Sequence, residues 1–212
     1  LFAILVYYRQ RIGELIRGTL SADPDSLVYV AQLAVATLPA VAVGLFARHA
    51  VERIFARPGW VAAALIVTGF ILWTTRWTVL RAHRLRPTWG LAIGVGLAQA
   101  LAIAPGISRS GTTVAAALAL GLAPRAAAEF SFLLGSVAIA GAAVLMLPDM
   151  VAASPEQLSD LALGSVAALL AGLVAIWAFV RMLDRQAFYL FAWYAWAVGL
   201  AFGLYVWVQP GN

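Results

Sequence analysis

Ten residues near the middle of the chain, Ala104 to Thr113, read APGISRSGTT and interrupt a long apolar run. A polar group that is buried without a partner is costly, and an ionisable residue at membrane depth marks a functional site by default. This segment is therefore the candidate functional site. Its polar side chains are those of Ser108, Arg109, Ser110, Thr112 and Thr113.

These residue types favour anion binding. If a helix breaks at Pro105-Gly106, the next helix begins with N–H groups that have no internal partner. Such amides bind anions together with the positive end of the helix dipole. Arg109 adds a planar fork suited to phosphate or carboxylate oxygens, and the hydroxyls add further donors. Gly106 and Gly111 let the backbone approach a ligand closely. The segment predicts a phosphate site.

A purely structural interpretation competes with this one. Small polar residues in membrane helices often hydrogen-bond inside the bundle, and Arg109 could pair with an acid such as Glu129. For Glu129 itself, a position near the membrane interface or an i,i+4 ion pair with Arg125 is the favoured interpretation. A carboxylate that supports Arg109 is the alternative.

Gln99 is a further candidate for the site, whereas the two histidines are not. Gln99 lies one to two turns before Pro105, where it could bind substrate or hydrogen-bond another helix. His49 and His83 lie in basic segments at the ends of apolar runs. We expect both histidines at the membrane interface.

The composition predicts that membrane helices position these residues. The 212 residues are 64% hydrophobic and 11% charged, whereas about a quarter of the residues of a soluble domain are charged. The apolar runs are continuous and lack the period of two that a transmembrane barrel shows. The chain is therefore predicted to be an all-α polytopic membrane helix bundle, a single membrane domain over residues 1–212.

Charge and cysteine content exclude other classes. The net charge of +5 comes from basic residues that are all arginine and lie in the breaks between apolar runs. Membrane topology explains that placement, so nucleic acid is not an expected partner. The chain contains no cysteine, which excludes disulfides and thiolate metal ligands.

A membrane-spanning helix needs about 20 apolar residues. The opening run LFAILVYY is shorter, so we expect the chain to be an N-terminally incomplete copy of something longer. Residues 88–122 are expected to form a re-entrant hairpin that enters and leaves the membrane on one side, with Pro105 to Gly111 as its turn. Full spans are predicted at 28–47, 59–77, 127–147, 161–180 and 188–208.

The distribution of arginines predicts the orientation. The basic segment 76–86 should face the cytoplasm, because cytoplasmic loops carry an excess of basic residues. The acidic loop 148–160 is then an outer loop. The basic break at 48–58 falls outside in this scheme, against the same tendency.

The motif PGISRSGTT resembles the PGxSRSxxT signature of the undecaprenyl-diphosphate phosphatases, the bacitracin-resistance family. PRAAAEFSFLL at 124–134 and LPAVAVGL at 38–45 are similar to further segments of that family. The resemblance extends from about Leu1 to Trp207.

This resemblance implies a hydrolase that depends on Mg²⁺ or Ca²⁺ and removes the terminal phosphate of undecaprenyl diphosphate. The reaction would take place at the outer face of the bacterial plasma (inner) membrane, recycle the lipid carrier of cell-wall synthesis and give bacitracin resistance. By the same resemblance, Arg109 would clamp the diphosphate and Ser108 and Thr113 would donate hydrogen bonds to its oxygens. Ser110 is a weaker candidate for that role.

The family fold consists of two inverted repeats, each with a re-entrant hairpin, and only the second hairpin is recognisable here. The first would supply the metal ligands, the base and the nucleophile, and would precede Leu1. No metal ligand is therefore expected within the chain, and the chain alone is expected to be inactive. The implied partners are a polyprenyl diphosphate lipid and the bilayer, with a homodimer as an open option.

Three other functions compete with this one. A transporter or flippase for an anionic or phosphorylated lipid would also use broken helices whose N-termini face an anion. The lipid phosphatases with a histidine nucleophile are disfavoured, because neither His49 nor His83 is near the motif. A structural scaffold would leave the cluster around Arg109 unexplained.

Overall fold

The computed structural model describes residues 1–46, 58–145 and 155–208. Helices account for nearly all of these residues, and the described ranges contain no β-strand element. The predicted all-α class is therefore confirmed. The α-helices are α1 (Phe2–Tyr7), α2 (Arg9–Leu20), α3 (Pro24–Phe46), α5 (Pro58–Thr78), α6 (Trp89–Leu101), α7 (Arg109–Ala119), α8 (Pro124–Leu145), α10 (Pro155–Asp184) and α11 (Phe191–Val208).

Five segments are long and apolar enough to cross a membrane, as the sequence predicts. The chain is accordingly a multi-pass membrane protein. The five segments are Pro24–Phe46, Pro58–Arg81, Pro124–Val144, Asp160–Asp184 and Phe188–Val208.

Two elements differ from the sequence-based expectation. The polar connection after the first apolar run forms helix α2, because Ile12 and Leu15 pack against the hydrophobic core. Helix α10 is longer than the predicted span 161–180, since it continues to Asp184. His49 and most of the acidic loop 148–160 lie outside the described residues.

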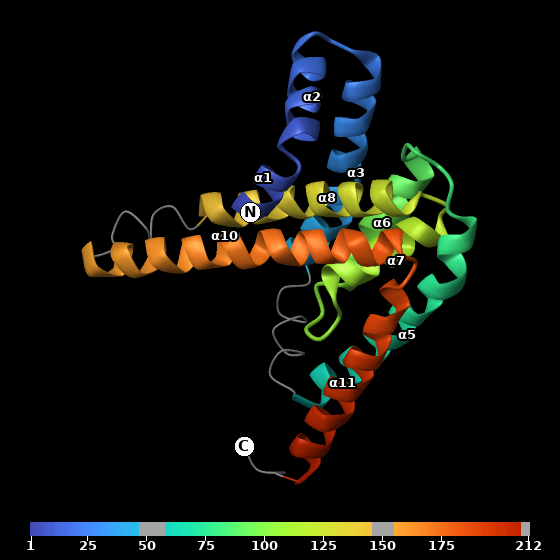
Figure 1. Cartoon of the computed structure of the whole chain (residues 1–212), viewed down its shortest axis with the longest axis vertical. Helices are drawn as coiled ribbons and strands as arrows, with labels where there is room; N and C mark the ends of the chain where they lie inside the picture. Colours follow the sequence, from blue (N-terminus) through green and yellow to red (C-terminus); the bar gives the residue numbers. More distant parts are fainter. Residues whose placement is uncertain (47–57, 146–154, 209–212) are drawn as a thin grey trace.

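The helices pack in pairs around α7. Helix α11 lies along α5, and α10 runs beside α8 (Figure 1). At the first contact Gly69 makes room for a tryptophan, because a Cβ there would lie 2.2 Å from Nε1 of Trp196. The Trp196 indole N–H donates to the carbonyl oxygen of Ile66 at 3.1 Å.

Helices α6 and α7 form a helical hairpin whose turn lies slightly earlier than expected, and its re-entrant course in the membrane stays a prediction. The residues between the helices are 102–108, and Gly111 lies inside α7. The helix starts at Arg109 because the Ser108 hydroxyl oxygen accepts a hydrogen bond from the Gly111 N–H at 3.2 Å. Such caps define helix N-termini.

The two ends of the hairpin are joined by backbone hydrogen bonds. The N–H of Arg84, before α6, donates to the carbonyl of Gly121, after α7, at 2.9 Å. The carbonyl of Arg84 accepts from the N–H of Ala123 at 2.8 Å. The chain therefore enters and leaves the hairpin at one end of the bundle.

Helix α7 lies inside the molecule, where α5, α6 and α8 contact it (Figure 1). Its side chains from Gly111 to Ala115 are buried, as are Ala117 and Leu118. Helix α7 is thus enclosed by other helices, whereas the turn residues 103–107 that precede it are half-buried.

Candidate functional site

The turn before α7 rests on α5. Gly106 has φ +90°, a left-handed backbone conformation that favours glycine. A Cβ on Gly106 would lie 2.5 Å from the carbonyl oxygen of Val61. A Cβ on Gly111 would lie 2.9 Å from a methyl group of Leu72. Both glycines thus permit close packing on α5, and their predicted contact with substrate stays a prediction.

The first turn of α7 presents unused donors. Helix geometry leaves the N–H groups of Arg109 and Ser110 without an intrahelical partner, whereas that of Gly111 is satisfied by Ser108. The side chains of Ser108 and Ser110 are exposed and line a cavity of about 320 Å³. The cavity also contains Thr68, and aromatic rings of Phe179, Phe188, Phe191 and Tyr194 line it.

Neutral groups orient the half-buried guanidinium of Arg109. Its Nε donates to Oε1 of Gln99 at 3.1 Å, and its Nη2 donates to the same oxygen. The carbonyl oxygens of Leu134 and Gly135, on α8, lie 3.5 Å from Nη2 and 3.4 Å from Nη1. Among the described residues no carboxylate forms an ion pair with Arg109. The positive charge of the side chain is therefore available to an anion.

Gln99 is 2% exposed and faces the guanidinium. Its Oε1 accepts both hydrogen bonds from Arg109, while its buried Nε2 has no partner within the described part of the chain. The structure thus gives Gln99 a contact with Arg109. Direct contact between Gln99 and substrate stays a prediction.

Thr112 and Thr113, the last two residues of the motif, are buried. The Thr113 hydroxyl lies 2.9 Å from the carbonyl oxygen of Arg109 and 2.5 Å from the hydroxyl of Ser131, which links α7 to α8. The Thr112 hydroxyl has no partner among the described residues. Donation by Thr113 to a substrate oxygen stays a prediction, and it would require the hydroxyl to leave these internal bonds.

The ion pair expected between Glu129 and Arg125 is wrong. Arg11 of α2 donates to Glu129 at 2.8 Å and the Tyr29 hydroxyl of α3 donates to it at 3.1 Å. Arg125 instead pairs with Asp184, at the end of α10, at 2.8 Å. Contacts between helices thus replace the contact along α8. Burial is the largest single effect and lowers the pKa of Arg11, but the charge of Glu129 and the hydrogen bonds to Glu129 and Glu14 together outweigh it, so the pKa is raised.

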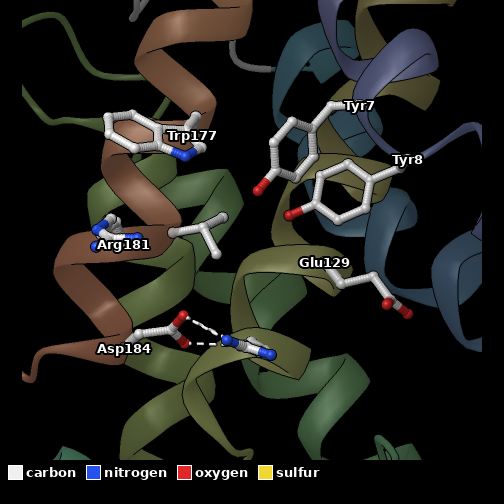
Figure 2. A pocket seen from close by; sticks show the side chains of 8 residues that line it. Tyr7, Tyr8, Glu129, Trp177, Arg181 and Asp184 are labelled. Atoms are coloured by element: carbon white, nitrogen blue, oxygen red, sulfur yellow. Dashed lines mark hydrogen bonds and ion pairs between the residues drawn. The ribbon is translucent and has the colours of Figure 1, made fainter.

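A second cavity, of about 430 Å³, contains no residue of the motif. Figure 2 shows the hydroxyls of Tyr7 and Tyr8 pointing into it, opposite Trp177 and Arg181. Its other charged groups are occupied, because Arg125 pairs with Asp184 and Glu129 pairs with Arg11. It is therefore a weaker candidate for binding an anion than the N-terminus of α7.

The described residues do not fit a divalent cation. They contain no group of three or more histidine, aspartate or glutamate side chains close enough to hold a metal ion. His83 is exposed and lies outside the helices. These side chains therefore do not place a metal ion.

Sequence reasoning missed two residues of the site. Thr68 on α5 hydrogen-bonds the turn, and Ser131 on α8 contacts Thr113. A single threonine or serine in an apolar helix carries no distinguishing signal in one sequence. Only the packing of separate helices brings these side chains to the motif.

Comparisons with known proteins give a consistent result. The family model described as bacitracin resistance protein BacA matches residues 1–201. An undecaprenyl-diphosphatase of Bordetella pertussis is 33% identical, and the alignment covers 99% of this chain and 80% of the relative. Undecaprenyl-diphosphatase 2 of Rhodospirillum rubrum is 38% identical over 94% of this chain and 74% of its own length.

Proposed function

The chain belongs to the bacitracin resistance protein BacA family, and we infer from this that it hydrolyses undecaprenyl diphosphate to undecaprenyl phosphate and inorganic phosphate. The reaction is that of an acid anhydride hydrolase. It recycles the lipid carrier of cell-wall synthesis and gives bacitracin resistance.

One structural observation supports this function most directly. Arg109 has a guanidinium that is oriented by neutral acceptors and has no carboxylate partner among the described residues. A guanidinium binds phosphate oxygens through two parallel N–H groups, which fixes the direction of the bound group as well as its charge. We propose that Arg109 clamps the diphosphate, with Gln99 holding the guanidinium in place.

The start of α7 supplies the neighbouring donors. The Ser108 oxygen accepts from the Gly111 N–H, so its own O–H can still donate to a phosphate oxygen. The N–H groups of Arg109 and Ser110 and the exposed hydroxyl of Ser110 are close by in sequence. Together these groups stabilise negative charge that develops on the phosphate, a form of catalysis that needs no proton transfer.

Ser108 is proposed to position substrate and not to attack it. An attacking serine normally requires an adjacent base. Among the described residues the Ser108 hydroxyl hydrogen-bonds only the Gly111 N–H, and the backbone of Ser108 bonds Thr68 and Thr112; none of these groups is a base. Nucleophile and base are accordingly sought outside the motif.

Four further properties are proposed from the family relationship. Hydrolysis is expected to require Mg²⁺ or Ca²⁺. The protein is expected to lie in the bacterial plasma membrane, with the site facing the outer side. A homodimer is an assembly to test. A chelator that leaves hydrolysis unchanged in the purified protein would contradict the first of these.

The decisive experiment uses the protein expressed from its complete gene. Phosphate release from undecaprenyl diphosphate is measured in detergent for the wild type, Arg109→Ala and Arg181→Ala. Removal of one preorganised donor typically lowers the rate by about a hundredfold or more, so Arg109→Ala should lose most activity. Arg181 lines the second cavity, and its variant should remain active. Lipid movement across vesicles without phosphate release would instead favour a transporter.

A further inference from the structure

We propose that Thr68 of α5 is a positioning residue for the diphosphate site, an inference that rests on the proposed function. Thr68 is 2% exposed and contacts the turn that precedes Arg109. Its hydroxyl donates to the carbonyl oxygen of Gly106 at 2.9 Å and accepts from the N–H of Ser108 at 3.1 Å. One side chain of another helix thus holds both sides of the turn.

The backbone groups that Thr68 binds belong to neither helix of the hairpin. Helix α6 ends at Leu101 and α7 begins at Arg109, so Gly106 and Ser108 lie between them. Backbone N–H and C=O groups away from water require partners. The Thr68 hydroxyl satisfies one of each.

The position of Thr68 on α5 explains why it can do this. A Cβ on Gly106 would lie 2.5 Å from the Val61 carbonyl oxygen of α5. A Cβ on Gly111 would lie 2.9 Å from the Leu72 side chain of the same helix. Residues three or four positions apart lie on one face of a helix, and Thr68 is four positions before Leu72 on α5. The turn and the first residues of α7 therefore rest on one face of α5, with Thr68 between the two contacts.

The functional consequence follows from the neighbours of Ser108. Its hydroxyl caps α7, and the next residue is Arg109. If the Thr68 hydroxyl is removed, the Gly106 carbonyl and the Ser108 N–H lose their partner, and the turn can shift on α5. A displacement of about 1 Å in a catalytic arrangement can lower a rate by about a hundredfold. Thr68 would act on the reaction through the turn, without touching substrate.

Three variants separate this role from packing. Thr68→Val keeps the shape and removes the hydroxyl, whereas Thr68→Ser keeps the hydroxyl and removes a methyl group. Thr75→Val is the matched control. Thr75 lies two turns further along α5, is also 2% exposed, and donates only to Leu72 of its own helix, at 2.6 Å.

The measurements are kcat and KM for undecaprenyl diphosphate, with size-exclusion profiles in detergent as a check of folding. We expect Thr68→Val to lower kcat by about tenfold to a hundredfold, the effect of one or two lost hydrogen bonds. Its KM should change by less than about threefold, because contacts that bind ground and transition states equally are retained. Thr68→Ser and Thr75→Val should remain within about threefold of wild type in both constants.

Each other result would overturn the proposal. Equal losses in Thr68→Val and Thr68→Ser would show that the methyl group matters, and equal losses in Thr68→Val and Thr75→Val would show a general effect on α5. A Thr68→Val protein that alone fails to fold would assign the hydroxyl to stability. Wild-type kcat with Thr68→Val would remove the role of Thr68 and leave the proposed function intact, whereas a wild-type protein that releases no phosphate would contradict the proposed function itself.

Discussion

Arg109 carries the first prediction at the residue scale. Its Nε and Nη2 atoms both donate to Gln99. The orientation of the guanidinium plane therefore depends on the planar arrangement of its N–H groups as well as on its charge. Lysine keeps the charge but cannot bind Gln99 and phosphate with parallel N–H groups. Arg109→Lys should therefore lose most phosphate release from undecaprenyl diphosphate. Activity within about threefold of wild type would mean that charge alone is sufficient.

Ser108 carries the second prediction. If its hydroxyl only positions a phosphate oxygen, Ser108→Ala removes one hydrogen bond and should lower the rate by about tenfold to a hundredfold. Loss of a nucleophile would be far more severe. Residual hydrolysis above background, with no phosphoryl-enzyme detected by mass spectrometry, is the expected result. A phosphate adduct on Ser108 of the wild type would assign the attack to Ser108.

At the element scale, the α6–α7 turn depends on Gly106. Its φ is +90°, and a Cβ added to it would lie 2.5 Å from the Val61 carbonyl oxygen, which leaves no room for a side chain. Gly106→Ala should lower the thermal stability in detergent and the activity together. Gly90→Ala is the control, because a Cβ at that helical position meets nothing within 4 Å. Equal melting temperatures for the two variants would contradict a strained, closely packed turn.

The same elements show what a single sequence can predict. Pro105-Gly106 is sufficient to locate the break between two helices, because both residues are unfavourable in a helix interior. The turn ends at Ser108 and not at Gly111, since the Ser108 hydroxyl caps α7. The predicted partner of Glu129 is wrong because sequence spacing gives neighbours along one helix only. Arg11 and Thr68 reach their partners through packing between helices, which the spacing of residues does not encode.

At the scale of the whole molecule, the arrangement of the hairpin bears on topology. The hydrogen bonds between Arg84 and the Gly121–Ala123 segment place both ends of α6–α7 together. Helix α5 ends at Thr78, shortly before this junction in the sequence, and begins at Pro58, at the opposite end of the helix. A hairpin with joined ends returns to the side from which it came. Residues beside Arg84 and Gly121 should thus share one face of the membrane, and the start of α5 should lie at the other.

The absence of cysteine from these 212 residues makes this arrangement directly testable, because each introduced cysteine is the only one within them. His83→Cys and Leu120→Cys place exposed thiols at the two ends of the hairpin. Gly59→Cys places one at the start of α5, where a Cβ meets nothing within 4 Å. Labelling with a membrane-impermeant maleimide is compared between intact cells and inverted membrane vesicles.

We expect the cysteines at 83 and 120 to react only in inverted vesicles, because the arginines at 76, 81, 84 and 86 favour the cytoplasmic side for this end of the bundle. The cysteine at 59 should react in intact cells. Labelling of 83 and 120 from opposite sides would show that α6 and α7 together cross the membrane, and the re-entrant hairpin would be wrong. If the cysteines at 83 and 120 reacted in intact cells and the cysteine at 59 only in inverted vesicles, the orientation would be reversed but the hairpin would stand. The hydrogen bonds that join the ends of the hairpin require only that 83 and 120 react from the same side.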